Sequence, residues 1–368
     1  MRLLYGIQGT GNGHLSRARE LVPALRQRGV DVDILCSGRA AEDYFDMQPF
    51  GSYQLRRGLS FVSRDGRVDL LGTWRHNRLT EFVRDVRTLS LRGYDAVLSD
   101  FEPVTAWAAR RAGVPSLSIS HQAAFLSPIP TEGDNAFNRL LMRQFAPVQH
   151  SVGLHWFHYN SPILPPIIAT RCIDDVTDNG RVVVYLPFED LPVIRAWLHQ
   201  CPQADFDCFH PQVKSEMVIK NIRLMPISLG GFRAALHACH GVIANAGFEL
   251  PSEAMVLGKK LLLKPLYGQF EQQSNMLALE LLGLATRLFA LDTPSLLRWL
   301  DSAAVGRVCF PDVAQAVAGW LVDGHWDFPS ALSQQLWQAV RFPCGVAENV
   351  QSWLPDSSEV MTSPLSST

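Results

Sequence analysis

The segment at residues 241–284 constrains the fold more than any other part of the sequence. An apolar run at residues 241–244 has the length of a buried strand, and Asn245-Ala246-Gly247 separates it from a helical segment at residues 250–257. A helix that begins just beyond the carboxyl end of a strand presents free N–H groups and the positive end of its dipole, which suit a phosphate. The pattern therefore predicts a strand, a turn and a helix that can hold a diphosphate.

A second strand and a polar loop continue this segment. The apolar run at residues 261–263 has strand length, and residues 268–273 (Gly-Gln-Phe-Glu-Gln-Gln) are predicted to form a loop dense in hydrogen-bonding side chains. The segment thus offers groups for a diphosphate at one end and for hydroxyl groups at the other.

The first half of the chain alternates strands and helices in the same way. Residues 2–7 form the first expected strand, residues 8–14 a glycine-rich turn, residues 16–28 a helix that ends at Gly29, and residues 30–36 the second strand. Such a βαβ start indicates a parallel sheet. Further strands, expected at residues 94–100 and 116–120, each end in polar residues.

The length of 368 residues favours two domains or one large one. We expect an α/β protein of two doubly wound Rossmann-like domains that face a cleft. Their expected bounds are residues 1–160 for the N-terminal domain, 161–170 for a proline-rich linker and 171–340 for the C-terminal domain, whose last helix can pack back on the first. The Ser/Thr-rich tail at residues 354–368 is expected to be disordered.

Composition excludes several classes of protein. With 47% hydrophobic and 18% charged residues and a net charge of −2, the chain is typical of globular proteins and indicates no nucleic-acid partner. Seven scattered cysteines without a C-x-x-C pair indicate a reducing compartment and no structural zinc. No signal peptide or apolar run of ~18 residues is present, so we expect a cytoplasmic protein.

Charge is distributed unevenly along the chain. Residues 1–165 contain 19 arginines, no lysine and 15 acidic residues, a net charge of +4. A high-GC coding bias explains this pattern as well as function does. Peripheral association with the inner face of a membrane is therefore one interpretation, and arginines on solvated helices are the other.

The glycine turn after the first strand does not fit the common nucleotide motifs. Its spacing is Gly9-x-Gly11-x-Gly13, and the third glycine of a dinucleotide fingerprint falls on His14. The second strand ends in Leu35-Cys36-Ser37, without the acid that binds a ribose, and no Gly-Lys-Ser/Thr follows. The turn instead allows close approach to the backbone and places a histidine at the start of a helix.

His14 and Asp100 are the candidate catalytic pair. Both lie where strands of one predicted sheet end, and a carboxylate that accepts a hydrogen bond from one imidazole nitrogen leaves the other able to remove a proton from a hydroxyl. Glu102 and His121 lie near the same edge. The alternatives are an exposed or capping His14, and an Asp100 that caps the helix beginning near residue 103.

Glu253 is the candidate ribose ligand in the second half. It lies in the helix after the glycine turn, where a carboxylate can accept hydrogen bonds from two hydroxyl groups. An ordinary acid near a helix N-terminus has the same sequence signature.

Together these residues resemble the GT-B glycosyltransferases, especially the peptidoglycan N-acetylglucosaminyltransferase and the UDP-glycosyltransferases of plant and antibiotic type. The resemblance covers residues 1 to about 340, and the chain is most similar to an uncharacterised microbial branch that shares Tyr185-Leu186-Pro187-Phe188-Glu189. It implies a metal-independent, inverting hexosyl transfer from a nucleotide sugar, expected to be a UDP-sugar, without a cofactor. The acceptor is unknown, with a lipid-linked or glycan hydroxyl as candidates.

The resemblance also assigns site residues. It places Asn245, Gly247 and Phe248 beside the diphosphate, Glu253 on the ribose, and Glu271 and Gln272, with Gln273 next to them, at the donor sugar. Gly11, Asn12 and Gly13 form the acceptor-side loop, His14 is the base, and Asp100 is its partner. Phe232 is expected near the nucleobase.

One departure limits the match. The plant-type signature has His-Cys-Gly-Trp-Asn where this chain has Asn245-Ala246-Gly247-Phe248, so the histidine that meets the diphosphate is missing. Two alternatives remain open at this point: a UDP-sugar 2-epimerase or hydrolase on the same fold, and a protein that binds a sugar nucleotide without turnover.

Overall fold

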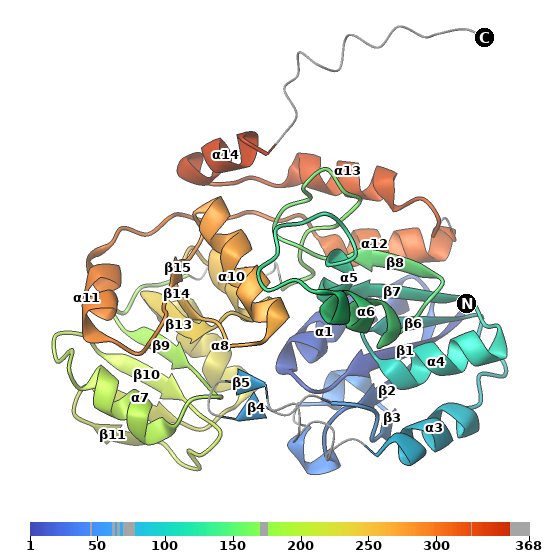
Figure 1. Ribbon diagram of the computed structural model, residues 1–368, viewed down its shortest axis with the longest axis horizontal. Helices are drawn as coiled ribbons and strands as arrows, with labels where there is room; N and C mark the ends of the chain where they lie inside the picture. The colour runs from blue at the N-terminus through green and yellow to red at the C-terminus, as the bar shows by residue number, and fades with distance from the viewer. Residues whose placement is uncertain are drawn as a thin grey trace, which may run out of the picture.

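The computed structural model describes residues 1–44, 46–60, 63–64, 67–68, 78–169, 176–324 and 326–353, and it contains two large sheets (Figure 1). The expected tail at residues 354–368 lies outside the described residues. The α/β class with parallel sheets is confirmed.

The first sheet has six parallel strands in the order β3-β2-β1-β6-β7-β8. Their bounds are β1 Arg2–Gln8, β2 Asp31–Ser37, β3 Tyr53–Arg56, β6 Ala96–Asp100, β7 Ser116–Ser120 and β8 His150–Gly153. The strand order reverses beside β1, so the carboxyl ends of β1 and β6 form a topological switch point, where open α/β sheets bind ligands.

Alternate side chains of β1 pack into two different hydrophobic clusters, one on each face of the first sheet. Leu3, Tyr5 and Ile7 pack with α1, whereas Leu4 packs with α4. The helices of this half are α1 Asn12–Gln27, α3 Leu79–Thr88, α4 Pro103–Ala112, α5 His121–Ala124 and α6 Ala136–Gln144. The buried residues on both faces explain why the strands read as continuous apolar runs.

The second sheet has seven strands in the order β11-β12-β10-β9-β13-β14-β15. Their bounds are β9 Val182–Tyr185, β10 Phe206–Phe209, β11 Met217–Ile219, β12 Ile222–Met225, β13 Gly241–Asn245, β14 Lys260–Lys264 and β15 Thr286–Arg287. All pairs are parallel except that of β11 with β12 at the edge. The helices of this half are α7 Leu191–Leu198, α8 Leu229–Ala238, α9 Glu249–Val256, α10 Phe270–Leu282 and α11 Thr293–Asp301.

Three C-terminal helices, α12 Val313–Asp323, α13 Pro329–Ala339 and α14 Cys344–Gln351, cross between the two halves (Figure 1). α12 lies against α1, where Gln315 donates a hydrogen bond to Gln27. α14 lies against α10 and donates from Asn349 to the carbonyl of Leu282. The end of the chain therefore contacts both halves.

Residues 161–170, which the sequence suggests as a linker, are packed into the core as far as they are described. Ile163, Leu164 and Ile167 are fully buried, and the carbonyl of Ile163 accepts hydrogen bonds from Ser333 and Trp337 of α13. The prolines remove backbone donors here without exposing the segment to solvent.

Two predicted boundaries are wrong. α1 begins at Asn12 instead of residue 16, so His14 lies in its first turn, and α10 begins at Phe270, so residues 271–273 are helical instead of part of a loop. In α10 the side chain of Gln269 accepts a hydrogen bond from the backbone N–H of Gln272. This cap starts the helix four residues earlier than the predicted loop allows.

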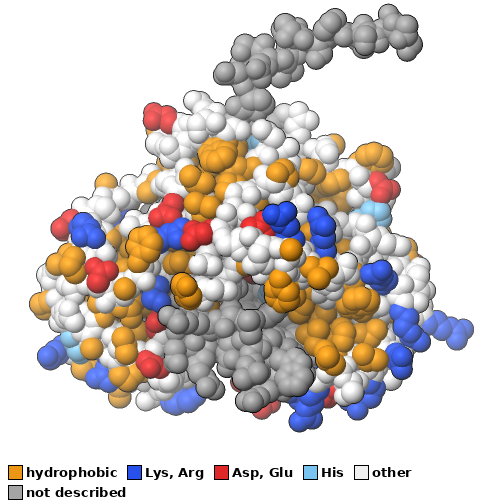
Figure 2. Space-filling view, viewed as in Figure 1, with side chains coloured by type: hydrophobic (Ala, Val, Ile, Leu, Met, Phe, Trp, Pro, Cys, Tyr) orange, Lys and Arg blue, Asp and Glu red, His pale blue; other side chains and the backbone are white. Residues whose placement is uncertain are grey.

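Acidic and basic side chains are mixed on much of the face in Figure 2. Basic side chains gather at its right-hand edge, in the region of α3 and α4, which carry arginines in their last turns. Within the described part of the chain, no helix has the length and apolar character needed to span a membrane.

We predict that Gly6→Ala destabilises the first sheet. A Cβ atom at Gly6 would lie 2.0 Å from Oγ1 of Thr105 and 2.9 Å from Oε2 of Glu102, so α4 would have to shift away from β1. Overpacking of this kind costs about 1–3 kcal/mol, which urea unfolding can measure. Gly345→Ala in α14 meets nothing within 4 Å and is the matched control, which should stay neutral. Equal stability of both variants would contradict the packing described here.

Candidate active site

His14 and Asp100 are hydrogen-bonded at the switch point of the first sheet. Nδ1 of His14 lies 2.8 Å from Oδ1 of Asp100. Asp100 is the last residue of β6 and is fully buried, whereas the His14 side chain is 12% exposed. The aspartate fixes the orientation of the imidazole and leaves Nε2 as the nitrogen that can take a proton.

Glu102, and not Asp100, caps α4. The carboxylate of Glu102 accepts hydrogen bonds from the backbone N–H groups of Val104 and Thr105 and from the hydroxyls of Ser37 and Thr105. Phe101 has a φ of 54°, a left-handed conformation that is rare for a bulky residue. This turn separates the directions of the two acids, so Asp100 reaches His14 while Glu102 stabilises a helix and is no candidate for the site.

A buried arginine completes the site. Arg17 lies one helical turn after His14, and its Nη1 donates to Oδ1 of Asp100 at 2.6 Å. Its Nη2 donates to Oε1 of Glu249, the first residue of α9 in the second half of the chain. Burial raises the pKa of Glu249, and the Arg17 guanidinium partly offsets that rise. Neither Arg17 nor Glu249 stands out in the sequence, although the spacing of three between His14 and Arg17 places both on one helical face.

The amino end of α9 faces this cluster. The N-cap residue of α9 is Phe248, whose side chain cannot accept a hydrogen bond, and no other described side chain caps the helix. The side chain of Asn245, at the end of β13, donates to the carbonyl of Lys264 at 2.9 Å, and its own Oδ1 is buried with no described partner. Nothing described lies within 4 Å of a Cβ at Gly247. These features leave helix N–H groups and open space for an anion.

Phe248 and His121 form part of the packing between the halves. Their rings are stacked with centroids 4.0 Å apart, and both side chains are buried. Nδ1 of His121 donates to the carbonyl of Leu154 at 2.9 Å, and Nε2 lies 2.6 Å from Oδ1 of Asn275. Burial lowers the pKa of His121. His121 is therefore structural instead of a cleft residue, and only the backbone of Phe248 remains available to a diphosphate.

Glu253 is half-buried one turn further along α9. It lines a small pocket with Arg233, Leu236, His237 and Val256, among others. Burial and the nearby charge of Glu249 raise its pKa to about 7. At neutral pH a carboxyl group with this pKa can accept a hydrogen bond from one hydroxyl of a diol and donate one to the other.

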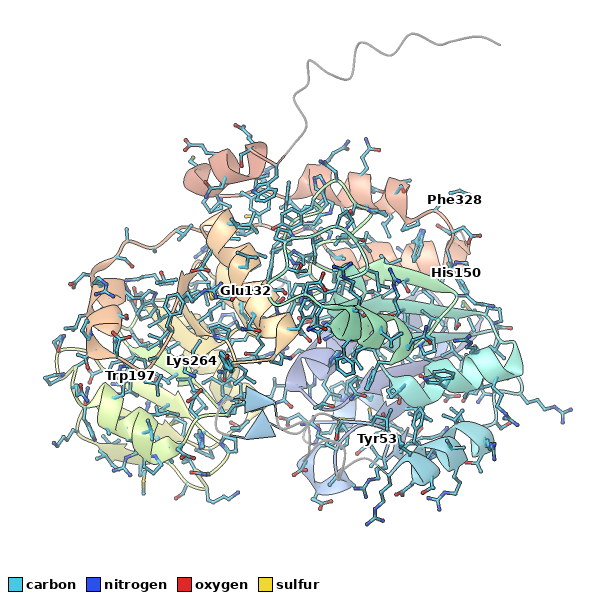
Figure 3. The ribbon with its side chains drawn as sticks, viewed as in Figure 1. Tyr53, Glu132, His150, Trp197, Lys264 and Phe328 are labelled. Carbon is cyan, nitrogen blue, oxygen red and sulfur yellow. The ribbon has the colours of Figure 1, made fainter. Side chains whose placement is uncertain are left out.

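The first turn of α10 faces the other half of the chain. Oε2 of Glu271 accepts a hydrogen bond from Gln122 of α5 at 3.0 Å. Oε1 of Gln272 accepts from the backbone N–H of Leu266, so this side chain closes the preceding loop. The half-buried Gln273 lies near Gly133. Lys264 and Glu132, which Figure 3 labels between the two halves, form ion pairs with Glu189 and Arg287.

Residues 11–13, expected as an acceptor-side loop, are the N-cap and the first two residues of α1, and they lie against α9 of the second half. Gly11 has open space around it, and the side chain of Asn12 accepts a hydrogen bond from Arg39 at 3.0 Å. A Cβ at Gly13 would lie 2.8 Å from Cγ of Glu249, so only glycine allows α1 to approach α9 this closely. Phe232 packs against Tyr185 and Phe209 beside this loop.

Comparison with known proteins identifies the family. The model of Glycosyl transferase family 1 matches residues 1–302. The chain belongs to this family. It is therefore an enzyme that transfers sugars. A search of curated proteins found no significant match.

Solved glycosyltransferases share the GT-B fold with this transferase at low identity. SsfS6 of Streptomyces sp. SF2575, complexed with thymidine diphosphate, has a TM-score of 0.56 at 12% identity over 92% of this chain and 100% of that chain. The glycosyltransferase of kitacinnamycin has a TM-score of 0.55 at 15% identity over 96% of this chain and 99% of that one. The spinosyn rhamnosyltransferase SpnG, complexed with thymidine diphosphate, has a TM-score of 0.52 at 15% identity over 95% and 100%. The more specific similarity to the peptidoglycan enzyme is confirmed only at the level of the family.

We predict that Glu253→Gln stabilises this transferase at alkaline pH. Between pH 4.5 and about 7 the unfolded chain has released the proton of Glu253 while the folded chain retains it, so this group's contribution to stability falls as pH rises through that window. At pH 8 the variant should gain about 2 kcal/mol in free energy of unfolding, and at pH 4 nothing. The exposed Glu42→Gln is the control. A gain for Glu253→Gln that is independent of pH would contradict the raised pKa.

Proposed function

We propose that this glycosyltransferase moves a sugar from a nucleoside diphosphate sugar to an acceptor hydroxyl by direct displacement with inversion. The observation that carries the proposal is the His14–Asp100 pair, which lies across from the uncapped amino end of α9. In the proposed step Nε2 of His14 takes the hydroxyl proton, the acceptor oxygen bonds to the anomeric carbon, and the bond from that carbon to the diphosphate breaks.

The diphosphate leaves with a negative charge that the N–H groups at the start of α9 stabilise. Asn245 and Gly247 border this space, and the N–H groups there are fixed before the reaction begins. In this proposal the helix supplies the charge stabilisation, so no metal ion is required.

The proposed donor is a UDP-sugar, with Glu253 on the ribose. A ribose offers two hydroxyl groups to one carboxylate, whereas the sugar of thymidine diphosphate, which SsfS6 and SpnG bind, has only the 3′-hydroxyl. The half-buried Glu253 with its raised pKa supports a diol ligand. Glu271, held by Gln122, is the proposed contact to the donor sugar.

Donor binding is tested by titration calorimetry with UDP-glucose, UDP-N-acetylglucosamine, dTDP-glucose and GDP-mannose. We expect one of the UDP-sugars to bind most tightly. Glu253→Gln should weaken UDP-sugar binding more than dTDP-sugar binding, because only UDP presents the 2′-hydroxyl. Tighter binding of dTDP-glucose would overturn the UDP assignment, and no binding of any of the four would overturn the donor site.

Catalysis is tested by nucleoside diphosphate release with the bound donor and a panel of alcohols and phenols. His14→Ala should keep donor affinity and lose about 100-fold or more in turnover, the range expected for a general base. His240 forms a matched pair with Asp178, also 2.8 Å apart, but on the exposed surface, so His240→Ala should leave turnover unchanged. Unchanged turnover in His14→Ala would reject His14 as base. Release of free sugar alone would indicate a hydrolase, and binding without turnover would indicate a non-catalytic protein.

A further inference from the structure

One guanidinium connects the proposed base to the other half of the enzyme. The side chain of Arg17 is 2% exposed and lies between two carboxylates, Asp100 of β6 and Glu249 of α9. Asp100 is in turn the partner of His14. Four ionisable groups therefore form a continuous chain from the base to the first residue of the helix that faces the diphosphate.

The contact between α1 and α9 is closely packed. The missing side chain at Gly13 allows Glu249 to come within reach of Arg17. The Arg17 guanidinium lies 5.9 Å from the centre of the Phe248 ring, and Trp156 donates to Ser252 of α9 at 2.8 Å beside it. The position of Glu249 relative to Arg17 is thus fixed by packing from both halves.

The charges in this chain set how readily His14 accepts a proton. With a neutral His14, the groups Asp100, Arg17 and Glu249 sum to −1, and protonation of the imidazole brings the cluster to zero. Without Glu249, Arg17 alone would neutralise Asp100, and the cation on His14 would have no net partner. Since the cluster is buried, its charges interact more strongly than they would in water.

Three further ionisable groups lie near this cluster. Tyr5 of β1 is fully buried, and burial raises its pKa, so it stays neutral. Burial lowers the pKa of His121 of α5. Glu253 of α9 lies one turn beyond Glu249 and has a raised pKa of about 7. Glu249 is therefore the nearest second-half charge that can offset Arg17.

We propose that Arg17 is a positioning residue whose ion pair with Glu249 makes the basicity of His14 depend on the docking of α9 against α1. This inference rests on the proposed role of His14 as base. Its consequence is that His14 is a stronger base toward the acceptor hydroxyl when the amino end of α9 is in place for the donor.

The test measures the neutral fraction of His14 without any sugar substrate. Diethyl pyrocarbonate acylates neutral imidazole, and trypsin releases His14 in a peptide that contains no other histidine: residues 3–17, or residues 3–19 where Arg17 is replaced. The rate of modification is measured by mass spectrometry at pH 6.5 and pH 8.5, and the ratio of the two rates is compared between variants. A merely loosened structure speeds both rates alike, whereas a charge effect changes their ratio.

Replacing Glu249 and replacing Arg17 should change this ratio of rates in opposite directions. Glu249→Gln keeps a hydrogen-bond acceptor for Arg17 but removes the charge, so the rate at pH 6.5 relative to pH 8.5 should rise, by up to about twofold. Arg17→Met should lower that ratio, and the double variant should return to the ratio of the wild type. Glu42→Gln removes an exposed acid that takes part in none of the described ion pairs, and it should change nothing.

The outcomes separate this inference from the proposed function. A Glu249→Gln ratio equal to that of Glu42→Gln would overturn the coupling, whatever the transfer assays show. Arg17→Met leaves the buried Glu249 without its described partner and leaves Asp100 with His14 alone, so this variant can fail to fold. Glu249→Gln and the double variant then carry the test on their own. If the ratios shift as expected while His14→Ala still transfers sugar, the coupling stands and the proposed base is wrong.

Discussion

The site depends on the burial of a positive charge between two negative ones. Removing Arg17, Asp100 or Glu249 from water is unfavourable for each group alone, and it becomes tolerable only when all three meet with good geometry. That requirement fixes the rotation of α1 on the first sheet, the end of β6 and the start of α9 at once. The single hydrogen bond that orients His14 is therefore held by contacts from both halves of the chain.

Much of the architecture could be predicted from the sequence, because it depends on local patterns. Short apolar runs, glycine punctuation and helical periods locate most strands and helices, including β13, α9 and β14 of the segment with which the sequence analysis began. The pairing of His14 with Asp100 was also within reach, since parallel strands bring their carboxyl ends to one edge.

The contacts between the halves could not be predicted in this way. Nothing local distinguishes Glu249 from any other acid in a first helical turn, and Arg17 looks like one of many arginines in an arginine-rich half. Likewise, two acids flank Phe101, and only its left-handed backbone decides that Glu102 caps α4 while Asp100 turns to His14. His121 was expected near the cleft because it follows the end of β7, and it does lie there in the chain. Packing against Phe248 and Asn275 nevertheless buries its side chain.

The position of α12 has a consequence for the order of biosynthesis. Val317 and Leu321 of α12 are buried in the same cluster as Leu21 and Leu25 of α1, which leave the ribosome about 300 residues earlier. At ordinary rates of translation this interval lasts roughly 15 to 60 s. Once β8 has been made, the first sheet has all its strands, while the apolar side of α1 that α12 covers is still exposed. The nascent N-terminal half therefore exposes an apolar surface, and with it a risk of aggregation, until α12 has been made.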